Sequence, residues 1–360
     1  HSSDELQPPL IVATFIKLFA ETDLKVNLFL DTSSISCVFR KTFVVFIGSP
    51  LMDIVARVDD RFLSRYSLQP DNAYSVDETN RNIFEEIKNN KTQIGGSVTN
   101  SVRVFRKLKD FPVAYLGSIG RDSYGQLIKR KLELEGIGSD LMEIQTENTG
   151  KVAVLLRGKA RTLVTDLGAS RVFPADEKMW KKIREASHIY LSAFFIGVSF
   201  ATITRIVEDG GKTIAINLGA PFLCAKYPEE VTYLYSNSSL VFGNEAEHRA
   251  FARLHNVAHK DLAEAVVGTN NSHGGESRVV VVTRGDKSVL VVRNGECEEF
   301  EVEPLDQSKI VDSNGAGDAF VGGFLSRYVA GESVANCVRC GIRVAQSKLC
   351  GGDFRDYATV

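Results

Sequence analysis

Short apolar runs recur along the chain from residue 42 onward, and most of them end at a glycine or a polar residue. Runs of this length with almost no polar interruption predict strands that are buried on both faces. Between the runs, apolar residues recur with helical spacing. This alternation is typical of an α/β fold in which helices cover both faces of a mostly parallel sheet. The predicted strands are 43–48, 113–117, 188–191, 213–217, 240–243 and 279–283, and the clearest helices are 101–108, 124–135 and 245–254.

Two stretches, at about 53–76 and 141–167, break this rhythm. The first begins with the alternating residues Ile54, Ala56 and Val58, and the second places Val152 and Val154 before a charged turn. Alternation is the pattern of strands that have one exposed face. We therefore expect antiparallel strands that form a small sheet, projecting from the main sheet as a lid.

Residues 1–40 differ from the rest of the chain. Their apolar residues follow no regular period, and the first residue is His1 rather than methionine. We expect an N-terminal extension that is either disordered or a remnant of a tag or of processing. Residues 41–360 are then expected to form one domain that includes the lid.

The composition excludes several classes of protein. With 44% hydrophobic residues among 360, the chain can bury a large core. A net charge of -2 provides no basic field for nucleic acid, and no apolar run approaches the ~20 residues that cross a bilayer. Six scattered cysteines, without the spacing of a secreted disulfide scaffold, fit a cytoplasmic protein with reduced thiols.

Neither the cysteines nor the histidines indicate a metal site. Cys337 and Cys340 have C-x-x-C spacing, but no second pair lies at finger-like spacing, so we expect two small apolar residues on a helix. His248, His255 and His259 have no carboxylate pattern beside them. We expect these three histidines on the surface.

The most informative segment is Asp312-Ser313-Asn314-Gly315-Ala316-Gly317-Asp318. It follows an apolar pair that can end a strand, and it leads into a segment with helical spacing. Glycines at 315 and 317 let backbone N–H groups converge, and the first turn of a helix adds unpaired donors and a positive dipole end. Asp318 lies beside this anion-attracting turn. An anion cradle with an adjacent base is what phosphoryl transfer to a hydroxyl requires.

Four further polar segments each follow a predicted strand. In open α/β sheets the carboxyl edge, where such segments gather, is where ligands bind. Asn244 and Glu247 stand one turn apart on one face of a predicted helix, so an amide and a carboxylate would lie together. The four segments are 95–101, 217–222, 244–247 and 283–285.

Taken together, these motifs resemble the ribokinase-like (PfkB) carbohydrate kinase family. The resemblance runs in order over about 43–354 and rests on motifs at 48–54, 95–101, 217–222, 242–245 and 312–318. It implies a three-layer α/β/α domain with a β lid. The sequences of several motifs are similar to those of the members acting on adenosine. This resemblance implies Mg²⁺-dependent phosphorylation of the adenosine 5′-hydroxyl by ATP to give AMP, a purine salvage reaction.

The resemblance also implies catalytic roles by position. Asp318 matches the family's catalytic base, and the backbone amides of Gly315, Ala316 and Gly317 match its anion hole. Arg161, in the lid, matches an arginine that reaches the phosphates.

Binding residues are carried over in the same way. Asp53, Gly95, Gly96 and Asn100 match residues that hold the ribose hydroxyls, and Glu247 matches a glutamate associated with Mg²⁺. The residues that fall where the family encloses the nucleobase are Leu163, Phe194, Phe195 and Phe222, and those that fall at the ATP site are Asn244, Thr283 and Gly285.

The sequence departs from the family pattern at two places, of which the first should have a mild effect and the second bears on base affinity and purine preference rather than on the reaction. Ser313 replaces the usual threonine and keeps the hydroxyl, whereas the lid segment 71–75 differs from the expected nucleoside pocket. The alternatives are another sugar or nucleoside kinase of the same family and a nucleoside-binding protein without turnover. We expect a monomer whose partners are adenosine and ATP.

Overall fold

The computed structural model describes residues 42–352 except 89, 159, 258–259, 274–276 and 312–313. By its internal contacts the chain divides into a unit at 1–41 and a unit at 42–360. The extension predicted at 1–40 lies outside the described residues, as do Asp312 and Ser313.

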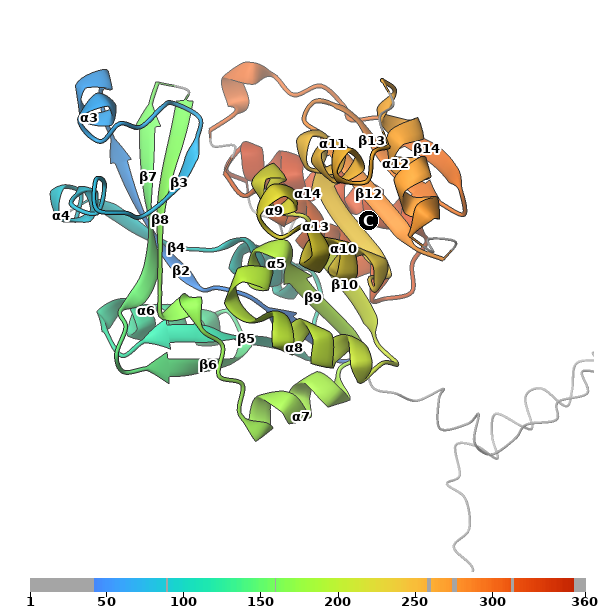
Figure 1. Ribbon diagram of the computed structural model, residues 1–360, viewed down its shortest axis with the longest axis horizontal. Coiled ribbons are helices and arrows are strands. Elements are labelled where there is room, and N and C mark those ends of the chain that lie inside the picture. The colour runs from blue at the N-terminus through green and yellow to red at the C-terminus, as the bar shows by residue number, and fades with distance from the viewer. Residues whose placement is uncertain are drawn as a thin grey trace, which may run out of the picture. The chain divides into compact units, whose positions relative to one another are not determined.

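A nine-stranded sheet forms the centre of the described unit (Figure 1). Its order is β14-β13-β12-β11-β10-β9-β1-β5-β6, and the strands from β12 to β6 pair in parallel while β13 and β14 are antiparallel additions at one edge. All six strands predicted from apolar runs are present, so the mostly parallel sheet is confirmed. The strands are β1 (Val44–Ile47), β5 (Val113–Gly120), β6 (Gly138–Ile144), β9 (His188–Ser192), β10 (Thr213–Asn217), β11 (Leu240–Asn244), β12 (Val279–Arg284), β13 (Lys287–Arg293) and β14 (Glu296–Phe300).

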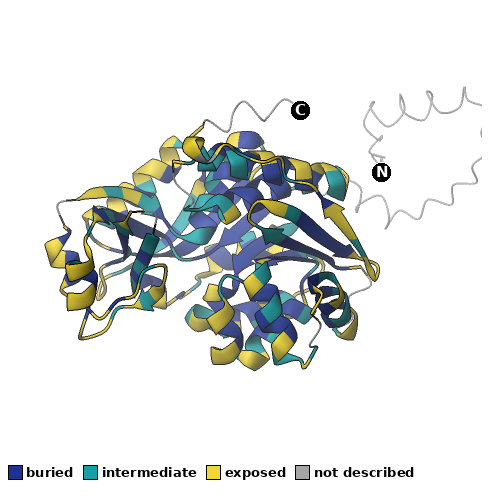
Figure 2. Cartoon of the chain, turned by 90° about the horizontal axis from the view of Figure 1, so that it is seen from above, coloured by how far each residue is buried: buried dark blue, intermediate teal, exposed yellow. Residues whose placement is uncertain are grey.

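Helices cover both faces of this sheet, which confirms the three-layer α/β/α arrangement. In β1, Val45 and Ile47 belong to one buried cluster while Val44 and Phe46 belong to the other, because successive side chains point to opposite faces. Figure 2 shows buried residues along the strands and exposed residues on the outer sides of the helices. One face carries α5 (Ser97–Leu108), α6 (Ser123–Leu134), α13 (Ala316–Tyr328) and α14 (Val334–Leu349); the other carries α7 (Glu177–Glu185), α8 (Ile196–Glu208), α9 (Pro221–Lys226), α10 (Pro228–Ser236), α11 (Glu245–Leu254) and α12 (Leu262–Ser272).

A second, five-stranded sheet has the order β3-β8-β7-β2-β4. One of its faces packs on the short helices α3 (Asp60–Arg65) and α4 (Ile83–Glu86) through Leu63 and Ile83. Its other face carries a smaller apolar cluster. The strands are β2 (Leu51–Arg57), β3 (Ala73–Ser75), β4 (Lys91–Gly95), β7 (Thr149–Arg157) and β8 (Ala160–Gly168).

The sequence-based expectation for this lid sheet is wrong in two respects. The segment at 141–144 belongs to β6 in the large sheet, because its alternating pattern is that of an edge strand with one exposed side. The sheet is also mixed rather than antiparallel, since β2 pairs with β7 and β3 pairs with β8 in parallel. Similarly, no strand is assigned to the apolar pair at 310–311.

Two glycines bring α13 close to its neighbours. A Cβ on Gly322 would lie 2.6 Å from the carbonyl oxygen of Ser101 in α5, and a Cβ on Gly323 would lie 3.2 Å from the Cα of Gly341 in α14. Side chains at these positions would push the helices apart, so the small residues set the spacing. The middle of α13 therefore packs closely on α5 and on the middle of α14.

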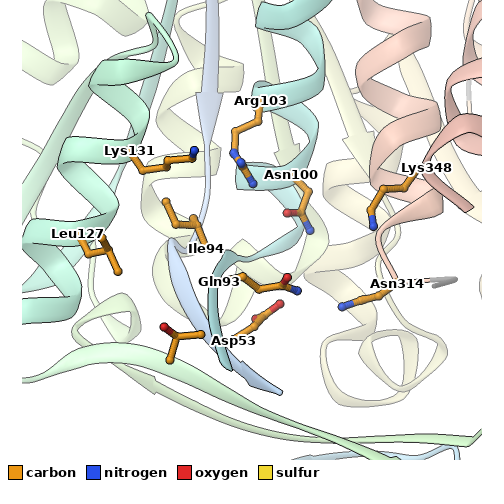
Figure 3. A pocket seen from close by; sticks show the side chains of 10 residues that line it. Asp53, Gln93, Ile94, Asn100, Arg103, Leu127, Lys131, Asn314 and Lys348 are labelled. Atoms are coloured by element: carbon orange, nitrogen blue, oxygen red, sulfur yellow. The ribbon is translucent and has the colours of Figure 1, made fainter. Parts of the chain in front are cut away.

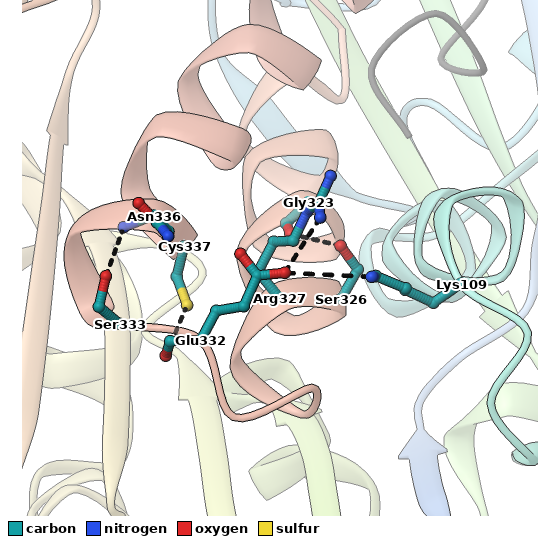
Figure 4. Close-up of polar contacts among 8 residues, drawn as sticks. All are labelled: Lys109, Gly323, Ser326, Arg327, Glu332, Ser333, Asn336 and Cys337. Atoms are coloured by element: carbon teal, nitrogen blue, oxygen red, sulfur yellow. Dashed lines mark hydrogen bonds and ion pairs between the residues drawn. The ribbon is translucent and has the colours of Figure 1, made fainter. Parts of the chain in front are cut away.

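The turn from α13 to α14 is held by a polar cluster (Figure 4). Arg327 donates to Glu332 at 3.0 Å, and Lys109 from the end of α5 lies 4.0 Å from the same carboxylate. Cys337 and Cys340 are buried on α14, which confirms the expectation of two small helical residues. Among the described residues, no helix combines the length and apolar character needed to span a membrane.

Candidate active site

Asp318 stands in the first turn of α13 and is held from α5. Ser97 Oγ donates to its Oδ1 at 2.6 Å, Asn100 Nδ2 donates to its Oδ2 at 2.9 Å, and Ser101 Oγ donates to its carbonyl oxygen at 3.0 Å. The residue before the helix, Gly315, has φ 74° and no side chain to cap the free amides. The first backbone N–H groups of α13 are therefore open to an anion beside the carboxylate.

Burial raises the pKa of Asp318 above that of an ordinary aspartate. Hydrogen bonds from Ser97 and Asn100 and the charges of Arg161 and Lys348 oppose this effect. The carboxylate is thus more basic than a solvated one while its charged form remains supported.

Arg161 lies on β8 of the lid sheet and reaches the turn before α13. Its Nη1 donates to Asn314 Oδ1 at 2.7 Å, and its backbone N–H donates to Asp71 Oδ1 at 2.9 Å. The sequence places these partners 153 and 90 positions away. The divergent segment at 71–75 thus anchors this arginine, and its strand β3 pairs with β8.

Asp53 lies on β2, opposite the glycine turn that opens α5. A Cβ on Gly95 would lie 2.0 Å from Asp53 Oδ1, and a Cβ on Gly96, whose φ is 96°, would lie 2.3 Å from the carbonyl oxygen of Ser49. Gly96 therefore requires glycine, and a side chain at position 95 would displace the carboxylate of Asp53. Asp53, Asn100 and Asn314 line one cavity of about 380 Å³, together with Gln93 and Lys348 (Figure 3).

The predicted base-enclosing residues divide into two groups. Phe194 is 42% exposed and Phe222 is 51% exposed, with ring centroids 6.2 Å apart. Leu163 is partly buried on the apolar lid face beside Val152 and Val154. Phe195, in contrast, is 2% exposed and packs edge-on against Phe173 in the core, because it points away from the surface that Phe194 occupies.

Asn244 and Glu247 form the capping box of α11. Asn244 donates its backbone N–H to Glu247 Oε2 at 2.9 Å and its side-chain amide to Oε1 at 2.7 Å, and Glu247 N–H donates back at 3.0 Å. Thr283 pairs with Asn244 across β11 and β12, and Gly285 follows with φ 69°. Burial raises the pKa of Glu247, as does the negative charge of Asp318.

The surface prediction for the histidines is wrong for His248. This side chain is 3% exposed, its Nε2 has no hydrogen-bond partner, and burial lowers its pKa to about 4. It follows Glu247 on the turn of α11 that faces the sheet. The polar sequence around it did not reveal this burial. His255 is partly buried and His259 lies outside the described residues. No group of three potential metal ligands is found in the described part of the chain.

Several site residues were missed from the sequence. Ser97 was visible in the glycine turn, but its pairing with Asp318 spans 221 positions. Asn314 lies inside the segment from Asp312 to Asp318, but the sequence alone assigned it no role. Asp71 lies in the divergent lid segment, but its contact with Arg161 could not be predicted, and Lys348 offered no local signal, since each reaches the site only through the packing of its strand or helix.

The comparisons with known proteins agree with this geometry. Residues 41–351 match the family described as pfkB family carbohydrate kinase. The chain is 33% identical over 310 residues to adenosine kinase 2 of Arabidopsis thaliana, with 82% of this chain and 90% of that protein covered.

Two solved structures are similar over most of their length. One is Anopheles gambiae adenosine kinase in complex with P1,P4-di(adenosine-5) tetraphosphate, with a TM-score of 0.81, 30% identity, and coverage of 85% of this chain and 95% of that one. The other is Schistosoma mansoni adenosine kinase in complex with 2-fluoroadenosine, with a TM-score of 0.79, 29% identity, and coverage of 87% and 98%.

Proposed function

The chain belongs to the pfkB family of carbohydrate kinases, and we propose that it transfers the γ-phosphoryl group of ATP to the 5′-hydroxyl of adenosine, giving AMP and ADP. One observation carries the proposal: a partly buried carboxylate, Asp318, is fixed by two side-chain donors beside the uncapped amino end of α13. The similarity to adenosine kinases over more than four fifths of the chain supports the nucleoside substrate.

Asp318 acts as the general base. Ser97 and Asn100 each occupy one lone pair of its two oxygens, which leaves further lone pairs to accept the proton of the attacking 5′-hydroxyl. A base with a raised pKa accepts this proton more readily, and the transfer is direct, without a phosphoenzyme.

The amino end of α13 and Arg161 bind the transferring group. Backbone N–H groups of Gly315, Ala316 and Gly317 form the anion hole that meets the charge on its equatorial oxygens. Arg161, now bonded to Asn314, exchanges that amide for a phosphate oxygen, to which its guanidinium offers parallel donors.

The nucleoside binds between the lid sheet and the carboxyl edge of the large sheet. Asp53 and Asn100, with the Gly95-Gly96 turn, hold the ribose hydroxyls in the cavity and so direct the primary alcohol to Asp318. Leu163, Phe194 and Phe222 enclose the adenine. An exposed phenylalanine pair offers more apolar area than a bare sugar requires, which favours a nucleoside over ribose or fructose.

ATP binds where β11 and β12 end, at Asn244, Thr283 and Gly285. The residues there also fit Mg²⁺. Each oxygen of Glu247 accepts one hydrogen bond from Asn244, so each keeps a second lone pair for a metal-bound water. When bound with ATP, Mg²⁺ neutralises charge on the phosphates. We further propose a monomeric cytoplasmic enzyme of purine salvage that contacts neither nucleic acid nor membrane.

A coupled ADP-release assay tests this proposal. The full chain is assayed with ATP and Mg²⁺ against adenosine, guanosine, inosine, ribose and fructose. Adenosine should give the highest kcat/KM, and omission of Mg²⁺ should abolish turnover. A higher kcat/KM for ribose or fructose would assign the site to a different sugar kinase, and binding of adenosine without ADP release would make the chain a nucleoside-binding protein.

A further inference from the structure

Lys348 lies in the last turn of α14 and is partly buried. It lines the same cavity as Asp53, Asn100 and Asn314, and Figure 3 shows its ammonium group pointing into that cavity. The preceding helix positions are packed on α13 through Gly323 and Gly341, so the place of Lys348 is set by close helix contact. A long cationic side chain is thereby held beside the site.

The space at Gly315 shows how near this lysine comes to the base. A Cβ on Gly315 would lie 3.6 Å from Asp318 Oδ2, 3.4 Å from Asn100 Nδ2 and 3.8 Å from Lys348 Cε. One small volume next to the anion-binding turn is thus bordered by the carboxylate, the amide that donates to it, and the lysine stem.

We propose that Lys348 is a positioning residue for the general base, acting through Asp318: its charge keeps that carboxylate ionised and ready to accept the proton of the acceptor hydroxyl. The inference rests on the proposed kinase function. It has a physical reason, because a carboxylate withdrawn from water otherwise favours its neutral form, which cannot take a proton. A nearby cation offsets part of that cost.

The other charged groups around Asp318 do not make this lysine redundant. Arg161 faces it from β8, but that guanidinium is bonded to Asn314 and is assigned to the phosphates. Among the described residues, Glu247 from α11 and Tyr190 from β9 are acidic groups that interact electrostatically with Asp318, and Asp53 from β2 lines the same cavity as Lys348. Glu247 opposes ionisation of Asp318, and burial raises the pKa of Tyr190, so this tyrosine stays neutral. Lys348 therefore supplies a positive charge beside Asp318 while the charge of Arg161 is engaged by the phosphates.

The test is the pH dependence of kcat/KM, from pH 5 to 9, in the full-length enzyme with saturating MgATP. The acceptor is adenosine or, should the substrate panel select another acceptor, that compound. Removing a cation raises the pKa of Asp318, so Lys348→Met should move the acid limb to higher pH. We expect a loss of roughly tenfold at pH 6 and of about twofold or less at pH 8.5, where the base is ionised in both proteins. Lys348→Arg should restore the wild-type profile.

Two comparisons separate this role from a structural one. Arg339→Met removes an exposed cation from the same helix, nine positions earlier, and should leave the profile unchanged. In an Asp318→Asn background, Lys348→Met should change the residual rate by less than about twofold, since the group it acts on is gone.

Any one of several results would overturn the inference. They are an unshifted acid limb in Lys348→Met, an equal loss at every pH, or the same fold loss in the Asp318→Asn background, which would indicate direct contact with a phosphate. A drop in Tm with an unshifted limb likewise makes Lys348 a packing residue. Failure of the proposed function is distinguishable, because it appears in the wild-type substrate panel.

Discussion

Asp318 and Glu247 occupy the same position in two different helices, but their hydrogen-bond partners come from different parts of the chain. Each is the third residue of its helix, α13 or α11, and burial raises the pKa of both. Glu247 is satisfied locally, because the residue before its helix is Asn244 and the two close a capping box. Asp318 has Gly315 at the corresponding place, so its partners come from α5, β8 and α14 instead.

The difference indicates what the missing cap achieves. A capping box uses the free amides of the first helical turn and fixes the carboxylate on its own backbone. Without it, the amides of α13 remain available to an anion, and the carboxylate is held by side chains of α5 instead. A local loss of helix stability thus accompanies a site that can do chemistry.

The largest contrast between the two carboxylates should be kinetic. Asp318→Asn keeps the shape of the side chain but removes the base, so kcat should fall by ~10²–10⁴ while adenosine binding is kept. Steady-state kinetics and calorimetric titration of adenosine measure the two effects. Turnover within about threefold of wild type would remove Asp318 from the role of base.

Filling the space at Gly315 should break the arrangement next. Gly315→Ala places a methyl group between Asp318, Asn100 and Lys348, at a backbone φ of 74° that costs an L-residue roughly 1–2 kcal/mol. We expect kcat to fall roughly 10²-fold through displacement of the base. The matched control is Gly331→Ala, which has φ 79° and no atom within 4 Å of its Cβ position, and should cost stability without the same loss of turnover.

The cap of α11 offers a stability effect of intermediate size. Asn244→Ala removes the side chain that accepts from Glu247 N–H and donates to its carboxylate, which should lower the free energy of unfolding by about 0.5–2 kcal/mol. Urea unfolding measures it. Unchanged stability, with a raised KM for ATP, would instead mean that Asn244 serves mainly the nucleotide.

The strands of the large sheet could be predicted from the sequence because burial on both faces leaves a continuous apolar run, as in β12. The lid could be predicted only in outline. Alternation marks a half-exposed strand but does not tell which sheet it joins, so β6 was assigned to the wrong one and β4 was not found.

The site divides along a similar line. The glycine turns and Asp318 were predictable, since their chemistry is local in sequence and matches a family pattern. Lys348, Asp71 and the pairing of Ser97 with Asp318 were not, because they depend on helix and strand packing over up to 221 positions. The roles proposed here for Asp53, Phe194, Phe222 and Arg161 remain predictions that the structure permits by position.

The smallest predicted effect concerns how Glu247 couples stability to pH. Burial raises the pKa of Glu247 in the folded state, so ionisation of this side chain opposes folding. Below the unfolded pKa of about 4.3 the side chain is protonated in both states and destabilises nothing. As the pH rises through the folded pKa, the protein loses stability. Glu247→Gln cannot ionise, but its amide faces the donor group of Asn244 and loses that hydrogen bond. The two effects oppose each other, so the net change in the free energy of unfolding at pH 7 should stay within about 1 kcal/mol.

The pH dependence of stability distinguishes the two effects, because the variant should gain stability relative to wild type between pH 5 and pH 8. Urea unfolding at several pH values measures this difference, with Glu298→Gln on exposed β14 as the control. A difference that stays flat with pH would mean that Glu247 is as well solvated as a surface glutamate, and the contrast with Asp318 would then lie in hydrogen bonding alone.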